Sequence, residues 1–394
     1  MSRGADATAD VLVLGGGVIG AATACLLARD YGARVRVLEP DPSYTRASSA
    51  LSASSIRQQF STPINIALSQ ASLAFLRILG DELAVDGERP DVGLVERGYL
   101  YLASALSADA LRTSAELQRA HGADIVLLDP AALSARYPWL ALDGIAAGSL
   151  GLRGEGWFDG PALLQAFVRK ARALGVRFIA SAAVKIETAN DRAVAVIDAQ
   201  GSRHEAGAVL IAAGAWSAPL AAQLAFDLPV RARKRDVFVF RSPATLPGCP
   251  LVIDPSGLWF RPDGSVFLCG APPRGDDIDD APLDAIDHGL FDDWLWPRLA
   301  ARVPAFESLR VLRAWAGYYE MNLTDHNGVV GRLPGWRNAF IGCGFSGHGM
   351  QHAPAVGRGL AELIATGRYA TLDLSPLAPQ RLRDGALLIE RNVI

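Results

Sequence analysis

The stretch "DVLVLGGGVIGAATACLLARDYGARVRVLEP", residues 10–40, decides the fold of this chain. Residues 11–14 are a continuous apolar run, as expected of a strand that is buried on both faces of a sheet. A glycine-rich turn follows at residues 15–20, then a run of small residues typical of a closely packed helix, and then a second strand over residues 34–38. This order predicts an α/β fold that starts with a parallel strand–helix–strand unit.

The glycines of this turn have the spacing G-x-G-x-x-G, which is typical of dinucleotide-binding folds. Gly15 permits the tight turn, Gly17 lets the backbone approach a pyrophosphate, and Gly20 lets the helix pack close to the strand. The helix that follows presents free N–H groups and a partial positive charge to the phosphates. The turn therefore predicts a pyrophosphate site at the front of the chain.

Glu39 closes the second strand, about 20 residues after the turn, where a carboxylate can accept hydrogen bonds from a ribose. A glycine-rich turn without a ligand is the alternative, but an acid at this strand end has no structural function. The fingerprint leaves NAD and FAD open. It disfavours NADP, because the acid would repel a 2′-phosphate.

Composition excludes several other classes of protein. The chain has 394 residues, of which 50% are hydrophobic and 20% charged, and its net charge is -3. No basic tail is present, and the basic run at residues 231–235 is interpreted as a solvated strand end, so nucleic-acid binding is not expected. Four scattered cysteines indicate a reducing compartment and no metal site.

The sequence also gives expectations about location. Residues 1–10 carry acids and no apolar core, which predicts neither a signal peptide nor a transit peptide. We find no window of about 18 apolar residues, so no membrane span is expected. These features together predict a cytoplasmic protein.

Two kinds of segment alternate along the chain. Strand-like segments at residues 93–104, 230–243 and 257–270, with a hairpin turn at Pro262-Asp263-Gly264, predict an antiparallel sheet. A capped helix and buried strands between them resume the dinucleotide fold. The predicted domains are a discontinuous cofactor domain (residues 1–90, 155–228 and 312–394) and a sheet domain (residues 91–154 and 229–311).

Two further segments have the composition of ligand-binding loops. Residues 40–60 are rich in Ser and Ala, which suits contact with an extended ligand as well as an exposed polar loop. Arg57 lies there among the apolar residues Ile56 and Phe60. A cation in this position either binds an anionic ligand or forms a surface salt bridge. Near the C-terminus, "FIGCGFSGHGMQHAP", residues 340–354, joins an apolar run to a helical pattern that is predicted over residues 355–364.

The ordered motifs "GGGVIG", "GWFDGPALL", "VLIAAGAWS", "AGYYEMNLTDHNGVVG" and "IGCGFSGHGMQHAP" resemble those of FAD-dependent oxidoreductases of the D-amino acid oxidase superfamily. The similarity is to the branch of sarcosine oxidase, glycine oxidase and dimethylglycine dehydrogenase. Nearly the whole chain also resembles a mitochondrial branch that assists the assembly of respiratory complex I, with "SIRQQFSTPINIALS" and "RVPAFE" among the similar segments.

The resemblance implies a fold and a cofactor. The fold would be a glutathione-reductase-type, Rossmann-like FAD-binding domain with an inserted mixed or antiparallel sheet domain over the flavin. The C-terminal turn would lie under the isoalloxazine ring, and the N-terminus of the next helix would stabilise the negative charge of the reduced ring. The residues implied at the cofactor are Gly15, Gly17, Val18, Ile19, Gly20, Glu39, Ser48, Ser49, Ser52, Val184, Ala213, Gly214, Gly317, Gly344, Phe345, Ser346, Gly347, His348, Gly349 and Met350.

The resemblance also implies substrate-site residues. Arg57 corresponds to an arginine that binds the substrate carboxylate, for which the planar guanidinium fork is suited. Tyr319 corresponds to an active-site tyrosine, and His348 is expected to pack or hydrogen-bond near the ring and not to act as a base. Trp259 and Tyr99 are candidates for the cavity wall, although core packing is the ordinary role of such aromatics.

The chain departs from sarcosine oxidases at three positions. Gln351 stands where they have a lysine that helps to hold the carboxylate, and is kept as a catalytic candidate. Gly317 stands at their flavin-linking cysteine, which predicts non-covalent FAD. Leu268 aligns with their oxygen-activating lysine, which favours a dehydrogenase or a slow oxidase, because a fixed cation speeds electron transfer to O₂.

Three functional hypotheses follow. The first is oxidation of the C–N bond of a secondary or N-alkyl amino acid by hydride transfer to FAD, with hydrolysis of the imine and with O₂ or another acceptor reoxidising the flavin. The second is an assembly or scaffold factor that keeps a structural FAD and binds a protein partner. The third is an NAD-dependent enzyme.

Overall fold

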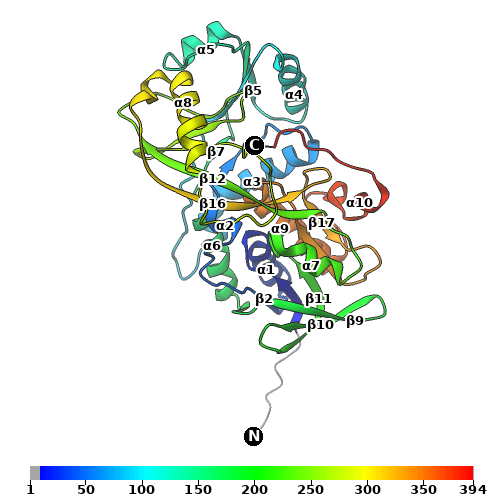
Figure 1. Ribbon diagram of the computed structural model, residues 1–394. Coiled ribbons are helices and arrows are strands. Elements are labelled where there is room, and N and C mark those ends of the chain that lie inside the picture. Colours follow the sequence, from blue (N-terminus) through cyan, green and yellow to red (C-terminus); the bar gives the residue numbers. More distant parts are fainter. Residues whose placement is uncertain (1–8, 394) are drawn as a thin grey trace.

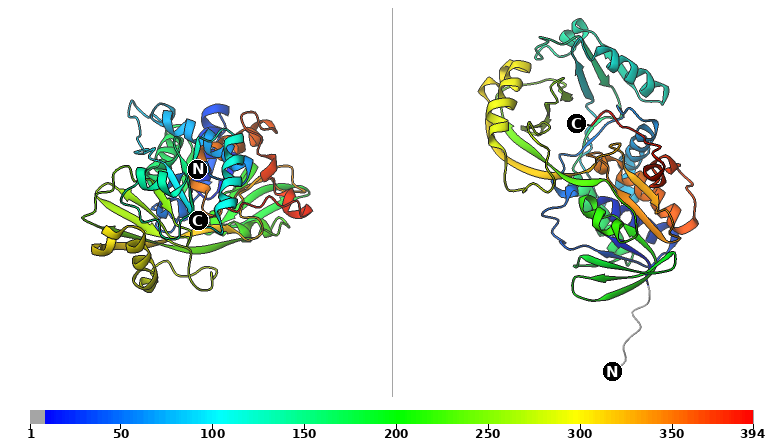
Figure 2. Two further views of the ribbon diagram at one scale, coloured as in Figure 1. Left: turned by 90° about the horizontal axis from the view of Figure 1, so that it is seen from above. Right: turned by 45° about the vertical axis from the view of Figure 1, so that its right-hand side comes forward.

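The computed structural model describes residues 9–393 and contains two eight-stranded sheets (Figure 1). The first sheet lies in the lower half of Figure 1, and the second sheet lies in the upper half. The right view of Figure 2 shows the same two units after a turn of 45° about the vertical axis. Residues 1–8 lie outside the described residues. They belong to the predicted cofactor domain and to the segment for which neither a signal peptide nor a transit peptide was predicted.

The first sheet is built around the strand predicted from the opening motif. β1 (Ala9–Leu14) pairs in parallel with β2 (Val35–Leu38) on one side and with β11 (Arg203–Ile211) on the other. Leu12 and Val13 are fully buried, which explains the continuous apolar run. The remaining strands are β8 (Arg177–Ile179), β9 (Ala183–Ala189), β10 (Arg192–Asp198), β17 (Val329–Arg332) and β18 (Ala339–Cys343).

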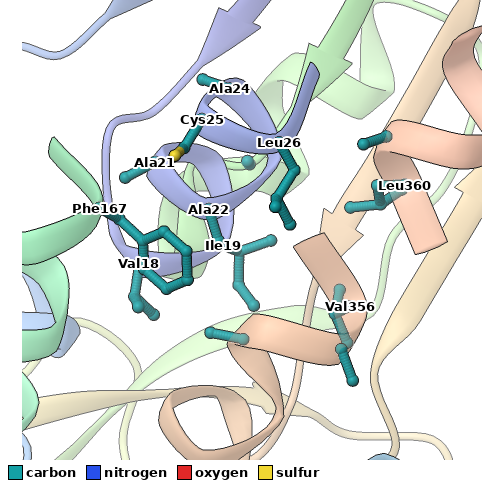
Figure 3. Packing of buried hydrophobic residues seen from close by; sticks show 14 of the residues in the cluster. Val18, Ile19, Ala21, Ala22, Ala24, Cys25, Leu26, Phe167, Val356 and Leu360 are labelled. Carbon is teal, nitrogen blue, oxygen red and sulfur yellow. The ribbon is translucent and has the colours of Figure 1, made fainter. Parts of the chain in front are cut away.

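Helices from distant parts of the chain pack together against this sheet. α1 (Val18–Tyr31) contacts both α6 (Gly160–Ala173) and α9 (Gly349–Thr366), and Figure 3 shows side chains of all three in one buried cluster. A Cβ atom on Gly357 would lie 2.7 Å from the Cβ of Ala22. The small residues of α1 and α9 therefore allow these two helices to approach closely, which brings the front and the back of the chain together.

α3 (Pro63–Glu82) corrects one expectation from sequence. By length and composition it could cross a membrane, since its mean hydropathy reaches 1.2, whereas no such window was expected. Its apolar residues include Ile66, Leu68 and Leu79, which are buried, and the helix packs against α9. Its hydropathy therefore reflects its position in the core of this fold.

The second sheet is mixed, because β13 (Leu251–Ile253) runs parallel to β4 (Tyr99–Ala103) whereas the other pairings of this sheet within residues 9–393 are antiparallel. The predicted hairpin joins β14 (Trp259–Asp263) to β15 (Val266–Gly270). The other strands are β5 (Ile125–Leu128), β6 (Ala147–Gly151), β12 (Val230–Arg241) and β16 (Arg310–Asn322). The fold class predicted from sequence is confirmed.

Shorter elements complete the chain. The helices α4 (Ala108–Ala120), α5 (Pro130–Arg136) and α8 (Trp296–Arg302) lie in the upper part of Figure 1. The others are α2 (Ser48–Leu51), α7 (Ser217–Ala222), α10 (Gln380–Asp384), β3 (Ser55–Ile56), β7 (Gly156–Trp157), η1 (Gly214–Trp216), η2 (Leu290–Leu295), η3 (Pro304–Ser308) and η4 (Ser375–Leu377).

Two boundaries differ from those expected from sequence. α9 begins at Gly349 and not near residue 355, so the last residues of the glycine-rich motif form its first turn. β16 pairs with β12 along its whole length, so residues 310–322 belong to the second sheet, and the boundary predicted at residue 312 falls inside this strand. The division into two domains otherwise stays a prediction.

Candidate cofactor and substrate site

A cavity of about 780 Å³ is lined by residues from both sheets. Its wall includes the end of β1, the first turn of α1, the Ser- and Ala-rich segment around α2, part of β16 and the first turn of α9. The front turn and the C-terminal turn, which are more than 300 residues apart in sequence, therefore share one cavity.

At the front turn, steric constraints explain Gly15 and Gly20 but not Gly17. Gly15 has φ +105°, and a Cβ atom there would lie 2.4 Å from the carbonyl oxygen of Ala212. A Cβ on Gly20 would lie 2.0 Å from the carbonyl oxygen of Gly15. At Gly17 the nearest heavy atom is the Ser49 hydroxyl, 3.3 Å away. The protein thus excludes side chains at Gly15 and Gly20, whereas Gly17 keeps the cavity side open.

Glu39 supports this turn, so the expectation that an acid at this strand end has no structural function is wrong. Its Oε2 accepts a hydrogen bond from the backbone amide of Gly16 at 2.8 Å, and its Oε1 accepts one from the amide of Asp41 at 2.9 Å. Burial raises the pKa of Glu39, while these two backbone donors oppose the shift. The carboxyl group lines the cavity and keeps further lone pairs, so the binding of a ribose hydroxyl there stays a prediction.

Most of the predicted cofactor residues line the cavity, and three do not. Gly20 lies behind the turn as described above. A Cβ on Gly344 would meet Val230 at 2.8 Å, and Phe345 packs its ring against Gly328. These three residues shape the wall from behind. The predicted residues on the wall are Gly15, Gly17, Val18, Ile19, Glu39, Ser48, Ser49, Ser52, Val184, Ala213, Gly214, Gly317, Ser346, Gly347, His348, Gly349 and Met350.

The C-terminal turn is fixed to β16. Ser346 donates its backbone amide to the carbonyl oxygen of Glu320 at 3.1 Å, and its hydroxyl accepts the amide of Asn322 at 3.0 Å. Gly347 has φ +93°, and a Cβ there would lie 2.5 Å from the Tyr319 ring. Tyr319 therefore packs directly on the turn, where the resemblance implies the flavin ring.

The N-terminus of α9 opens onto this cavity. His348 is the N-cap residue, Gly349 to Gln351 begin the helix on the cavity wall, and the first turn contains no acidic residue. The free N–H groups and the helix dipole therefore place partial positive charge there, which favours a group that gains electrons.

Arg57 contacts the C-terminal turn through His348 and the first turn of α9 through Gln351. Its side chain is only 2% exposed and stacks on Phe60, with 3.9 Å from the guanidinium carbon to the ring centroid. Nη1 donates to the carbonyl oxygen of Gln59 at 2.5 Å, and Nη2 contacts His348 Nε2 at 3.2 Å and donates to the carbonyl oxygen of Asn392. Within residues 9–393, no carboxylate forms an ion pair with Arg57. The site therefore holds a buried cation without a direct counterion.

Two side chains beside Arg57 are fixed by this environment. Burial and the charge of Arg57 lower the pKa of His348 well below its ordinary value, so the ring is neutral and its Nε2 can accept a hydrogen bond from Arg57. Gln351 Oε1 accepts the backbone amide of Arg57 at 2.9 Å. Both residues line the cavity, as do Tyr319, Trp259 and Tyr99, so the substrate-site residues predicted from sequence are brought together.

Besides the exposed Arg46, the wall carries two largely buried cations that sequence analysis missed. Arg235 lines the cavity, forms two bonds of 2.9 Å with Asp277 and stacks 5.1 Å from the centroid of the Tyr319 ring. The interpretation of residues 231–235 as a solvated strand end is therefore wrong for Arg235, whose side chain is 14% exposed. Alternation along β12 places every second residue on the same side of the strand, but it does not show which side lines the cavity.

The second of these cations, Arg261 on β14, is the register partner of Leu268 on the neighbouring strand β15. Leu268 is buried and is not part of the cavity wall, whereas Arg261 is part of it and donates to Asp263 and to the carbonyl oxygen of Ala53 at 2.8 Å each. The loss of a lysine at position 268 therefore does not leave this wall without cations. The absence of a lysine at position 268 is therefore weaker support for a dehydrogenase or a slow oxidase than the sequence alignment alone suggested.

Glu320 is a further residue that sequence analysis missed. It lines the cavity, and its carboxylate accepts the backbone amides of Gly344 and, at 3.4 Å, of Phe345. Burial raises the pKa of Glu320 to about 7. The wall of the cavity thus carries a carboxyl group that is neutral in weak acid and anionic in weak base.

This shift predicts a pH-dependent flavin spectrum. Because the Glu320 pKa is raised, the group is protonated below about pH 7 and gains negative charge as the pH rises through that value. We expect the visible absorption of the bound flavin to change with a midpoint near pH 7, and the Glu320→Gln variant to lack this transition. An identical transition in both proteins would assign it to another group.

The mode of FAD attachment follows from the position of the thiols. All four cysteines are buried and none lines the cavity, and Gly317 lies on the wall against Leu51. Non-covalent FAD is therefore expected. Acid precipitation of the purified yellow protein should leave all the flavin in the supernatant, and flavin that stays with the pellet would contradict this.

Among the described residues, no cluster of His, Cys, Asp and Glu that could hold a metal ion is present.

Comparisons with known proteins agree with this geometry. Residues 10–363 match the family described as FAD dependent oxidoreductase (DAO). The chain is 41% identical to FAD-dependent oxidoreductase domain-containing protein 1 of Xenopus laevis, over 98% of this chain and 85% of that protein. It is 30% identical to glycine oxidase of Geobacillus kaustophilus, over 94% and 97% respectively.

Solved structures show the same fold. L-proline dehydrogenase from P. horikoshii superimposes with a TM-score of 0.85 at 24% identity, covering 97% of this chain and 99% of that chain. Glycine oxidase from Geobacillus kaustophilus superimposes with a TM-score of 0.80 at 27% identity, covering 95% and 99%. The family match, the identities and the shared fold together establish that this chain belongs to the DAO family of FAD-dependent oxidoreductases.

Proposed function

We propose that the protein oxidises the C–N bond of a secondary or N-alkyl amino acid. The observation that carries the proposal is the buried Arg57 cation, which has no ion-pair partner among the described residues and lies on the wall of the flavin cavity. A buried charge is costly unless it is paired, so such a site favours a bound anion. A substrate carboxylate supplies that anion.

The chain's own residues then have defined tasks. Arg57 holds the carboxylate, and Gln351 and the neutral His348 keep the Arg57 backbone and side chain in place. Tyr319 packs on the C-terminal turn and closes the wall beside Arg235. FAD bound in this cavity would supply the hydride acceptor for the carbon next to nitrogen, and the imine product would be hydrolysed by water. The partial positive charge at the N-terminus of α9 would stabilise the negative charge of the reduced flavin ring.

A structural role for FAD is the second candidate. It is supported by the 41% identity to a relative whose name states no substrate, and by the engagement of Arg57 by the chain's own carbonyl oxygens. In that case the protein would act through a protein partner. Cytoplasmic location, O₂ or another electron acceptor, and the absence of nucleic-acid binding stay predictions.

An anaerobic titration separates these candidates. The purified protein is mixed with N-methyl amino acids, cyclic imino acids and D-amino acids while the flavin absorbance is followed. Bleaching by one class would establish catalysis and name the substrate class, and recovery of colour in air would measure the reaction with O₂. No bleaching by any of them, with dithionite still reducing the flavin, would reject the proposal in favour of a structural flavin.

A further inference from the structure

The C-terminal segment at residues 388–392, here called the strap, runs beside the start of α3 (Figure 2). Its central residue, Glu390, has no exposed surface. The carboxylate of Glu390 accepts the amide and hydroxyl of Ser61 at 2.8 and 2.6 Å, the hydroxyl of Thr62 at 2.8 Å and the Asn65 amide group at 3.0 Å. A fully buried carboxylate with this many donors is a built anchor.

The strap is also held by its backbone. Glu390 donates its amide to the carbonyl oxygen of Asp325 at 2.9 Å, and the Asn327 side chain donates to the carbonyl oxygen of Leu388. Asp325 is itself fully buried and pairs with Arg381 at 2.8 Å. The path of the strap is therefore fixed at several points before it reaches Arg57.

Beyond this anchor the strap contacts Arg57. The carbonyl oxygen of Asn392 accepts a hydrogen bond from Arg57 Nη2. The Asn392 side chain donates to the carbonyl oxygen of Gln59 at 3.1 Å, and Gln59 accepts from Arg57 Nη1 through that same oxygen. The amide of Asn392 returns to Glu390 Oε1 at 2.9 Å. Glu390 thus fixes the backbone group that holds the guanidinium.

The arrangement has a direction. Arg57 and His348 line the cavity, whereas Gln59 and Asn392 are not among the described residues on its wall. The strap and Gln59 therefore engage the guanidinium from behind. A guanidinium has five N–H donors, so satisfying some of them from behind leaves others for a ligand on the cavity side.

We propose that the strap is a positioning element of the anion site, in which Glu390 and Asn392 fix the Arg57 guanidinium toward a carboxylate bound in the cavity. This inference rests on the proposed function, which assigns Arg57 to a substrate carboxylate. It adds that the carboxylate affinity of the site depends on a segment more than 300 residues away in sequence.

The charges around Arg57 agree with this role. Burial alone would raise the pKa of Glu390, but hydrogen bonds from Ser61 and the charge of Arg57 outweigh it and lower the pKa, so Glu390 is ionised. Glu390 nonetheless forms no ion pair with Arg57 within the described residues. The strap orients the cation and leaves its direct pairing to a ligand.

The test uses the FAD-bound protein and two probes of similar size, propionate and propionamide, with binding followed by the shift of the flavin spectrum. Only propionate carries the negative charge that Arg57 would recognise. In the Glu390→Gln variant we expect the Kd of propionate to rise about tenfold, with the Kd of propionamide unchanged. The Arg391→Ala variant, which alters an exposed side chain of the strap, should match the wild type.

Three outcomes would overturn the proposal. An unchanged propionate Kd would show that the strap has no effect on the anion site. Equal loss for both probes would show a general structural role. Tighter binding of propionate would show that the Asn392 carbonyl competes with the ligand. Because binding at equilibrium needs no turnover, these results are independent of the amine titration that tests the proposed function.

A measurement on the unaltered protein covers the case in which Glu390→Gln fails to fold. Hydrogen exchange of the peptide that contains residues 388–392 is compared without ligand and with saturating propionate. A strap that supports the bound state should exchange more slowly when propionate is present. Equal or faster exchange would reject the positioning role.

Discussion

The Gly20→Ala variant is expected to lose both its FAD and much of its stability. The new Cβ would lie 2.0 Å from the carbonyl oxygen of Gly15, a backbone atom that cannot move without opening the turn. Gly15 is itself confined by the carbonyl of Ala212, so the strain cannot spread in that direction. Overpacking of this kind costs about 3 kcal/mol. The thermal midpoint of the FAD-free protein should fall by several degrees.

Gly17→Ala is the matched control for this variant. Its Cβ would meet only the Ser49 hydroxyl at 3.3 Å, and Gly17 has an ordinary φ of -61°. The FAD-free Gly17→Ala protein should therefore keep wild-type stability and still bind FAD weakly, because the methyl group occupies the approach of the pyrophosphate. FAD affinity is measured by flavin fluorescence and stability by thermal unfolding. Tight FAD binding by the Gly17→Ala variant would contradict the assignment of the pyrophosphate site to this turn.

The front turn was predictable because its determinants are local. Strand, glycines, helix and acid lie within residues 10–40, and the pattern encodes the steric reason for Gly15 and Gly20. The start of α9 was not predictable in the same way. Gly349 and Pro354 are poor helix formers, so periodicity predicted a helix that begins after them. Burial of Met350 and Ala353 in the core outweighs those propensities.

The additional cavity residues depend on long-range pairing. Arg261 takes its place on the wall through the register of β14 and β15, and Arg235 through that of β12 and β16. Glu320 reaches the cavity because β16 crosses beside the C-terminal turn. A single sequence shows alternation along a strand but not the partner strand, so these three residues could not be separated from ordinary strand residues.

Replacement of Arg57 is the second change with a large expected effect. In the Arg57→Ala variant, kcat/KM for amino-acid substrates should fall about 100-fold, because a charge-assisted hydrogen-bond pair contributes up to about 3 kcal/mol. The loss should be far smaller for amines without a carboxylate. Flavin content and dithionite reduction are measured alongside, because the carbonyl oxygens of Gln59 and Asn392 lose a donor.

Arg57→Lys separates charge from geometry. Lysine keeps the positive charge, but its single ammonium cannot hold the carbonyl oxygens of Gln59 and Asn392 and a carboxylate in the same planar arrangement. Its kcat/KM should therefore lie between those of the wild type and Arg57→Ala, with the loss mainly in KM if Arg57 serves binding. A loss of equal size for amines with and without a carboxylate would show that Arg57 supports the cavity wall and that another cation, Arg235 or Arg261, meets the substrate.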